Sequence, residues 1–370
     1  MPWGSSLRPD TFRILAINPG STSTKLGLYV DERPKFAKNI RHSEVEMAQF
    51  RRRPVVDQRQ FRCAQIESAL AESGHNVHEL HAVVGRGGLL PPLASGTYLV
   101  NEAMLDALRL ARRGDHASNL GAFLAHDIAQ KAGVQAYVVD PVSVDEWPAY
   151  ARVSGSALLE RQCLSHALNS KAVAKRYARE RGKAYESLRL IVAHLGSGIS
   201  VSAHKSGCMT DVTNSREEGA FSTERAGGVP AMQLVDLCFS GRYTRNQVED
   251  LLIRDGGLYS YLGTKDLEEV ERRITSGEAK ASIVYEAMVC QIAREIGAMA
   301  TVLNGSVDAL LLTGGMAHSQ RLVSAVSEHV GWIAPIVVYP GEDELQALTE
   351  GVLRALRHEE HLRVFRSAGT

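Results

Sequence analysis

The residues best suited to chemistry begin in a short polar loop near the start of the chain. Asn18, Ser21, Ser23 and Lys25 follow the apolar run at residues 14–17. Hydroxyl groups and the backbone N–H groups of glycine-containing loops bind anions, and a lysine adds positive charge. The loop is therefore a candidate phosphate site. It is not a Walker P-loop, because the Gly-x4-Gly-Lys-Ser/Thr pattern is absent.

A second loop of the same kind lies in the other half of the chain. His194, Gly196, Ser197 and Gly198 follow the apolar run at residues 190–193. Each loop stands between two apolar runs, which predicts a β-hairpin with a polar tip. His194 would lie at the carboxyl end of its strand, where ligands of open α/β sheets gather. The repetition predicts a duplicated domain that holds the phosphates of a nucleotide between its halves.

A glycine pair and two arginines add to these loops. Gly314 and Gly315 follow an apolar strand, and a helix that starts there could direct its N-terminus at a phosphate or nucleoside; the alternative is a tight turn. Arg86 and Arg225 are each followed closely by glycines that leave space for a ligand. Guanidinium groups match carboxylate and phosphate oxygens in pairs of hydrogen bonds. His166 is a further candidate contact.

Carboxylates follow two further strands. Asp140 ends the apolar run at 136–139 and precedes a proline, so it could hold Mg²⁺ through water or simply form a turn. Glu342, Asp343 and Glu344 follow the strand at 336–339. They could bind a metal or equally begin a helix, because carboxylates favour helix N-termini.

Strands and helices alternate along the chain, which predicts an α/β fold. Residues 144–156 look like a crossing between the halves, and the closing helix is expected to return to the first. We therefore expect a first domain at 1–150 plus about 345–370 and a second at 151–344. Cys290 stands in a helical pattern with Ile283, Ala287 and Arg294, and we interpret it as a core residue. The expected helices are 56–73, 101–113, 118–132, 157–181, 231–241, 244–254, 278–304 and 345–363.

Bulk composition narrows the class of protein. The 370 residues are 44% hydrophobic and 23% charged, with a formal net charge of +0. This balance is ordinary for a globular protein and argues against a nucleic-acid partner. No apolar stretch is long enough for a membrane helix, and the start has no signal-peptide core. The five scattered cysteines suggest reduced thiols, so we expect a cytoplasmic protein without a membrane partner.

Taken together, these motifs resemble the acetate kinase family, of the acetate and sugar kinase/Hsp70/actin superfamily. The runs Gly85–Leu90 and Val235–Gly241 look like its butyrate kinase branch. Ser197 stands where acetate kinases have Asn, and Ser170 replaces the second His of their His-x3-His motif, which argues against acetate as substrate. The matching stretches are residues 17–25, 83–88, 139–145, 194–200, 224–228 and 340–345.

The resemblance implies two RNase H-like (actin-like ATPase) domains with an active-site cleft between them. It also implies reversible phosphoryl transfer from ATP, with Mg²⁺, to butyrate or a similar short-chain acid, giving ADP and acyl phosphate. A homodimer or larger homo-oligomer is expected.

The resemblance assigns roles to residues of this chain. Arg86 and Arg225 would hold the carboxylate and the transferring phosphoryl group, with His166 and His194 near that group. Asp140 would be tied to Mg²⁺, and one of the acidic residues Glu342–Glu344 would be linked to the metal, with Glu342 and Asp343 the candidates. The expected nucleotide and phosphate contacts are Asn18, Ser21, Ser23, Lys25, Gly196, Ser197, Gly198, Gly314 and Gly315.

The chemistry agrees with these residue types. A fatty-acid carboxylate is ionised at neutral pH, so the nucleophile needs charge stabilisation and not a general base. Two alternatives remain. A sugar or polyol kinase on this scaffold would use Asp140 as base, and an actin-like switch would need no acceptor, against which the two arginines argue. Leu89 and Leu90, next to Arg86, are candidate walls for the acyl chain.

Overall fold

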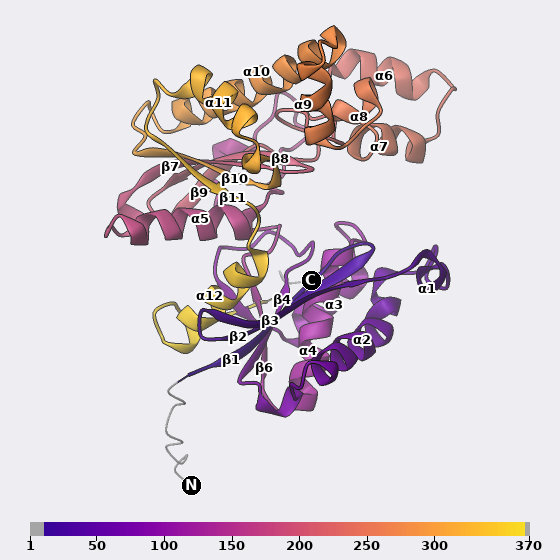
Figure 1. The fold of residues 1–370 in the computed structure, drawn as a ribbon, viewed down its shortest axis with the longest axis vertical. Helices are drawn as coiled ribbons and strands as arrows, with labels where there is room; N and C mark the ends of the chain where they lie inside the picture. Colours follow the sequence, from indigo (N-terminus) through magenta and orange to yellow (C-terminus); the bar gives the residue numbers. More distant parts are fainter. Residues whose placement is uncertain (1–10, 367–370) are drawn as a thin grey trace. The chain divides into compact units, whose positions relative to one another are not determined.

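The computed structural model describes residues 11–366, and these form two compact units (Figure 1). The first unit comprises the residues up to Ser143 together with those from Asp343 onward. The second unit is Val144–Glu342. The outer ends of the predicted first domain, 1–10 and 367–370, lie outside the described residues.

The first unit is built on a seven-stranded sheet of order β12-β5-β6-β4-β1-β2-β3. β1 is antiparallel to β2 and β2 to β3, whereas β1, β4 and β6 run parallel. The first polar loop therefore lies at the β1–β2 turn, as the sequence predicted. The strands are β1 (Arg13–Pro19), β2 (Ser23–Val30), β3 (Arg33–Arg41), β4 (Ala82–Arg86), β5 (Thr97–Leu99), β6 (Gln135–Val139) and β12 (Arg363–Val364).

The second unit repeats this pairing in a five-stranded sheet of order β11-β10-β7-β8-β9. β7, β8 and β9 form an antiparallel meander, and β7, β10 and β11 run parallel. β7-β8-β9-β10-β11 thus corresponds to β1-β2-β3-β4-β6, which confirms the duplicated α/β fold. The strands are β7 (Arg189–Leu195), β8 (Ile199–Lys205), β9 (Cys208–Val212), β10 (Ala309–Gly314) and β11 (Ile336–Pro340).

Helices pack on the sheet of the first unit. α4 contacts β4 so closely that a Cβ at Gly85 would meet the Gly121 carbonyl oxygen at 2.0 Å. α12 packs on β1, β4 and β6 and ends at Leu356, not near 363 as expected. Asn101 caps α3 through its side chain. The helices are α1 (Glu44–Ala48), α2 (Arg59–Glu72), α3 (Glu102–Leu110), α4 (Leu120–Ala132) and α12 (Glu344–Leu356).

In the second unit, α5 packs on β7 and β10, and α10 packs on β7 and β8. The expected helix at 157–181 starts only at Ala167. Residues 157 and 158 form a turn between the bridged Ser156 and Leu159, and the chain is irregular from 160 to 166. The Ser154 hydroxyl donates to the carbonyl oxygens of Ser156 and Leu159 and so competes with helical hydrogen bonds. The helices are α5 (Ala167–Glu180), α6 (Ala231–Phe239), α7 (Arg245–Ile253), α8 (Gly257–Leu262), α9 (Leu267–Thr275), α10 (Ala279–Val302) and α11 (Gln320–Val330).

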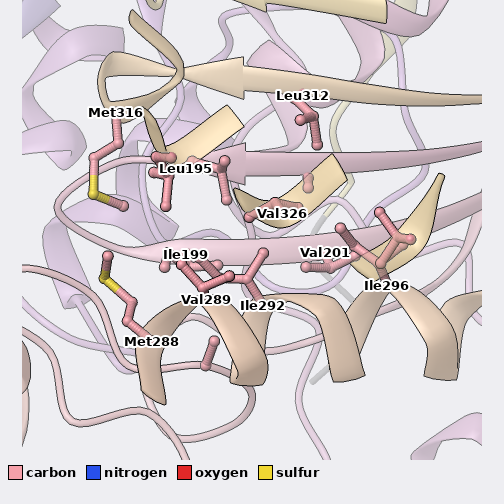
Figure 2. Packing of buried hydrophobic residues seen from close by; sticks show 14 of the residues in the cluster. Leu195, Ile199, Val201, Met288, Val289, Ile292, Ile296, Leu312, Met316 and Val326 are labelled. Carbon is pink, nitrogen blue, oxygen red and sulfur yellow. The ribbon is translucent and has the colours of Figure 1, made fainter. Parts of the chain in front are cut away.

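The main core of the second unit lies between α10 and the sheet. Figure 2 shows Met288, Ile292 and Ile296 of α10 facing Ile199 and Val201 of β8, and all five are buried. The interpretation of Cys290 as core was wrong, because it lies with Ile283 and Ala287 on the exposed face of α10. A long helix with apolar residues on both faces does not reveal its buried face by composition alone.

The cysteines of the described residues are all free thiols. Cys63 and Cys163 are buried, and burial raises the pKa of both thiols well above the ordinary value. Cys238 and Cys290 are exposed. None of the helices described at 11–366 combines the length and apolar character needed to cross a membrane.

Candidate active site

The first polar loop presents several side chains to solvent. Ser21 and Lys25 are exposed and Ser23 is half-buried, whereas Asn18 at the end of β1 is buried. The turn is closed by a hydrogen bond of 2.7 Å from the Gly20 N–H to the Ser23 carbonyl oxygen. The hydroxyls and the lysine amine are therefore accessible to an anion.

A carboxylate at the start of α12 connects two of the predicted residues. Glu344 is buried and accepts a hydrogen bond from the Asn18 side-chain amide. Its other oxygen, Oε1, lies 2.5 Å from Nη1 of Arg86. The remaining guanidinium nitrogens of Arg86 have no partner among the residues described. Glu344 thus orients Arg86 and leaves the rest of its guanidinium available to an anion.

Asp140 is held in an unusual backbone conformation just after β6. Its φ is +37°, a region that non-glycine residues visit at a cost, and its side chain is buried. Oδ1 accepts hydrogen bonds from the Ser95 hydroxyl at 2.7 Å and from the Gly96 N–H at 2.8 Å. Oδ2 accepts none from the described residues. The carboxylate is therefore rigidly oriented with one oxygen left for a ligand.

In the second unit, two predicted histidines stack. The ring centroids of His166 and His194 are 3.8 Å apart and the planes differ by 11°. Nδ1 of His166 hydrogen-bonds to the Ser200 hydroxyl at 2.9 Å, and Nδ1 of His194 to Oδ1 of Asn169 at 2.8 Å. These contacts fix both rings at the end of the β7–β8 hairpin.

Glu342 approaches the same pair of rings. Its Oε1 lies 2.9 Å from Nε2 of His194, although not in hydrogen-bonding geometry. A Cβ at Gly196 would come within 2.9 Å of that oxygen and 3.0 Å of that nitrogen. Glycine at this position therefore leaves room for the close approach of the Glu342 carboxylate to the His194 ring.

Arg225 lies against the other glycine of this loop. A Cβ at Gly198 would meet Nη1 of Arg225 at 2.6 Å, so only glycine allows the approach. Nη1 donates to the hydroxyl and carbonyl oxygens of Ser215, whereas the buried Nε has no partner. Arg225 forms no ion pair with a carboxylate of residues 11–366, and burial lowers its pKa. A half-buried guanidinium with a buried, unpartnered Nε and no ion pair is suited to an anionic ligand.

The predicted glycine pair, Gly314 and Gly315, lies at the end of β10. Gly314 has a φ of +92° and packs on Leu195, where a Cβ would meet the carbonyl oxygen at 2.3 Å. A Cβ at the exposed Gly315 would meet nothing within 4 Å. A short 3₁₀ turn, Gly315–His318, precedes α11, so the pair does not lead directly into an α-helix. The pair is a tight turn beside the second loop.

The donor set for a metal is sparse. No group of three or more His, Cys, Asp and Glu side chains that could hold a metal ion is present within residues 11–366. Mg²⁺ bound with a nucleotide needs only one or two protein carboxylates, because phosphates and water supply the other oxygens. Asp140, with its unengaged Oδ2, and the exposed Asp343 fit that requirement; Glu342 faces His194 instead.

Sequence reasoning missed some residues of these clusters. Asn169 was not singled out, although a polar residue one turn into α5 after His166 could have been considered. Ser95, which orients Asp140, gave no signal. Leu90 was proposed as a pocket wall, but it is fully buried in the hydrophobic core of the first unit and cannot reach a bound acid. Leu89 remains partly exposed.

Known proteins share both the second-unit sequence pattern and the fold. Residues 156–334 match the model of the Acetokinase family. Acetate kinase from Porphyromonas gingivalis is similar with a TM-score of 0.75 and 18% identity, covering 92% of this chain and 99% of that chain. A propionate kinase from Francisella tularensis subsp. tularensis has a TM-score of 0.71 and 17% identity, and the match covers 92% of this chain and 98% of that chain. Acetate kinase from Entamoeba histolytica has a TM-score of 0.73 and 16% identity, and the match again covers 92% of this chain and 98% of that chain.

These structural similarities, at such low identity, concern the fold. They agree with the two sheets of matching topology and with the expected two-domain, actin-like architecture. The family match lies entirely within the second unit, which contains both stacked histidines and Arg225. Residues 156–334 of the second unit are thus similar in sequence to the acetokinase family, and the fold of the chain is that of the acetate kinases.

Proposed function

We propose that the protein is an ATP-dependent carboxylate kinase that reversibly phosphorylates butyrate or a similar short-chain fatty acid. The acetokinase match of residues 156–334 supports phosphoryl transfer to a carboxyl group. The acetate and propionate kinases that share the fold act on acids of this class by their names. The two runs that resemble the butyrate kinase branch support the longer acyl chain.

The observation that carries this proposal is the environment of Arg225. Its guanidinium lies against Gly198 and its buried Nε has no hydrogen-bond partner; the charge of Glu224 acts on it, but no carboxylate of the described residues forms an ion pair with it. Leaving a buried charge uncompensated is costly, so such a group is kept where a ligand supplies the counter-charge. A phosphoryl group or a carboxylate supplies it here.

The reaction needs positioning and charge stabilisation more than proton transfer. An ionised acid attacks the γ-phosphorus of ATP, a P–O bond to its carboxylate oxygen forms, and the bond to ADP breaks with the electron pair leaving on ADP. No proton moves in that step, because the acid is already ionised at neutral pH. Arg225 stabilises the charge on the transferring group, and the N–H group at Gly198 can add a donor.

Residues of the first unit are assigned complementary roles. Ser21, Ser23 and Lys25 bind phosphate oxygens, and Arg86, oriented by Glu344, binds an anionic group of a substrate. Asp140 would hold Mg²⁺ through Oδ2, with Asp343 as a second candidate. When bound, Mg²⁺ neutralises phosphate charge. The first unit therefore contributes anion and metal binding.

The test is ADP release with Mg-ATP and a panel of acceptors: acetate, propionate, butyrate, isobutyrate and glycerol. Butyrate-class acids are expected to give the highest kcat/KM, with formation of an acyl phosphate that hydroxylamine traps. Activity on glycerol alone would favour the sugar kinase alternative. ATP hydrolysis that is indifferent to every acid would contradict the carboxylate kinase proposal.

A matched pair of arginine variants sharpens this test. Arg225→Ala is expected to abolish acid-dependent ADP release. Arg245→Ala is the control, because Arg245 is exposed on α7 and its ion pair within residues 11–366 is with Glu249, one turn away. Equal activity of the two variants would remove Arg225 from the site.

A further inference from the structure

A buried arginine outside the proposed catalytic set contacts the first phosphate loop. Arg62 on α2 is fully buried, with 0% of its surface exposed. Its Nη1 donates to the carbonyl oxygens of Gly20 at 2.8 Å and Ser23 at 3.1 Å, and to the Thr24 hydroxyl at 3.0 Å. Its Nη2 donates to the Ser21 carbonyl oxygen at 3.2 Å. One guanidinium thus binds three carbonyl groups of a single turn.

The charge on Arg62 has no carboxylate counterion among residues 11–366. Its remaining contacts are to the neutral Gln58 side chain, from Nε at 3.0 Å and Nη2 at 2.7 Å. Burial lowers the pKa of Arg62 to about 10, so the group stays charged at neutral pH. Burial and the nearby guanidinium lower the pKa of His42, which binds Thr24, so that ring adds no charge.

The neighbouring arginine on the same helix shows the ordinary arrangement. Arg59 pairs with Asp127 through Nε and Nη2. This ion pair raises the pKa of Arg59, whereas the pKa of Arg62 is lowered. The two arginines lie within one turn of α2, but only Arg62 keeps an uncompensated charge next to the loop.

The contacts of Arg62 decide which groups of the loop face outward. The carbonyl oxygens of Gly20, Ser21 and Ser23 are occupied by the guanidinium and so are withdrawn from a ligand. An anion is repelled by carbonyl oxygens and attracted by N–H groups, hydroxyls and amines. Ser21 and Lys25 remain exposed on the same turn.

We propose that Arg62 is the positioning residue of the first phosphate loop, binding its carbonyl groups and adding positive potential, and thereby sets affinity for nucleotide phosphates. This inference rests on the proposed function, in which that loop binds ATP. Arg62 does not itself touch the ligand, because its guanidinium nitrogens are engaged within the protein. Its effect is therefore expected on nucleotide binding and not on the acceptor.

The test compares Arg62→Met, Arg62→Lys and the control Arg59→Met. KM for ATP, KM for the acid and kcat are measured at low and high salt. The shift in melting temperature on adding Mg-ADP provides a readout that needs no acceptor. We expect Arg62→Met to raise KM for ATP about tenfold, the factor typical of losing hydrogen bonds to a charged group, with KM for the acid unchanged.

The control separates loop positioning from stability. Arg59→Met should lower the melting temperature but leave KM for ATP and the Mg-ADP shift unchanged, since Arg59 touches no loop atom. Arg62→Lys keeps the charge but loses the paired donors, so its KM for ATP should lie between those of wild type and Arg62→Met. If Arg62→Met does not fold, Arg62→Lys is judged by the same criterion.

The two proposals fail in different ways. A wild-type enzyme active on an acid, with ATP KM and Mg-ADP shift unchanged in the folded Arg62 variants, would overturn the role of Arg62 alone. Equal rises in both KM values would also overturn it. A wild type inert on every acid, but with a Mg-ADP shift that Arg62 variants lose, would overturn the acceptor assignment and support the positioning role.

Discussion

The imidazole rings of His166 and His194 lie face to face, with centroids 3.8 Å apart. They come from different segments, one just before α5 and the other at the end of β7. Each ring packs on the other and is held by a hydrogen bond of its own, to Ser200 for His166 and to Asn169 for His194. The rings are therefore expected to act as one unit on the same group.

This relationship predicts non-additive mutational effects. His166→Ala and His194→Ala should each lower kcat/KM about 100-fold, within the range for positioned electrostatic groups. The double variant should lose little more than the worse single variant, because each ring requires the other. Steady-state kinetics of the four proteins measures the coupling. A double-variant loss equal to the product of the single losses would show independent roles, and His329→Ala, exposed on α11, is the control.

A substitution at Arg225 should distinguish an effect on kcat from an effect on substrate binding or stability. Arg225→Lys keeps one positive charge but cannot reproduce the planar guanidinium, so kcat should fall about 100-fold or more. The substitution should change stability little, since the native group forms no ion pair with a carboxylate of the described residues. Measuring kcat, KM for the acid and the unfolding midpoint checks both parts. A large loss of stability with unchanged kcat would assign Arg225 to the scaffold.

Local patterns predicted the hairpins and the alternating strands correctly. Each polar loop stands between short apolar runs, and strand pairing across a tight turn depends on neighbours in the sequence. The duplicated topology could likewise be inferred, because both loops carry the same pattern. The end of the chain was harder: α12 stops at Leu356, where the expected helix continued to 363.

Contacts between distant residues could not be predicted in the same way. Asn18 and Glu344 are 326 positions apart, and the choice of Glu344 over its acidic neighbours depends on where α12 meets β1. Arg62 lies on the same face of α2 as the buried Ile66 and Ala69. A charged residue on an apolar helix face was the one feature of the sequence that could have drawn attention to it. Nothing local indicated that it would bind the loop at Gly20. The predicted roles of the site residues stay predictions.

Glu344 provides a prediction about the orientation of Arg86. Glu344→Gln removes the charge that holds the guanidinium while nearly preserving side-chain size. Stability should fall by about 1–3 kcal/mol, because the Asn18 amide and Arg86 lose a charged partner. KM should rise for the anionic ligand that Arg86 binds. Chemical denaturation and steady-state kinetics check the two effects.

The control for this prediction is Glu359→Gln, since Glu359 is exposed beyond the end of α12. It should change neither stability nor KM. If Glu344→Gln behaved like this control, the contacts of Glu344 with Asn18 and Arg86 would have no energetic role in solution.

His204 predicts how the stability of the second unit depends on pH. The ring is fully buried, and its nitrogens hydrogen-bond to the Tyr185 hydroxyl at 2.7 Å and the Ser202 hydroxyl at 2.8 Å. Burial, and then the charge of Lys171, lower its pKa to about 3 from the ordinary 6.5. Between these values the unfolded chain binds a proton that the folded protein does not. Stability therefore falls as pH decreases from 6.5 toward 3.

The size of this effect and its origin can both be measured. A full proton of difference corresponds to about 1.4 kcal/mol per pH unit. His204→Gln should remove that part of the slope between pH 6 and pH 4, whereas His329→Gln, on the exposed face of α11, should keep it. Urea unfolding followed by tryptophan fluorescence is suitable, because Trp147 and Trp332 both lie in the second unit. If the slope of stability against pH were unchanged in His204→Gln, the pH dependence would come from other groups and not from the buried His204 ring.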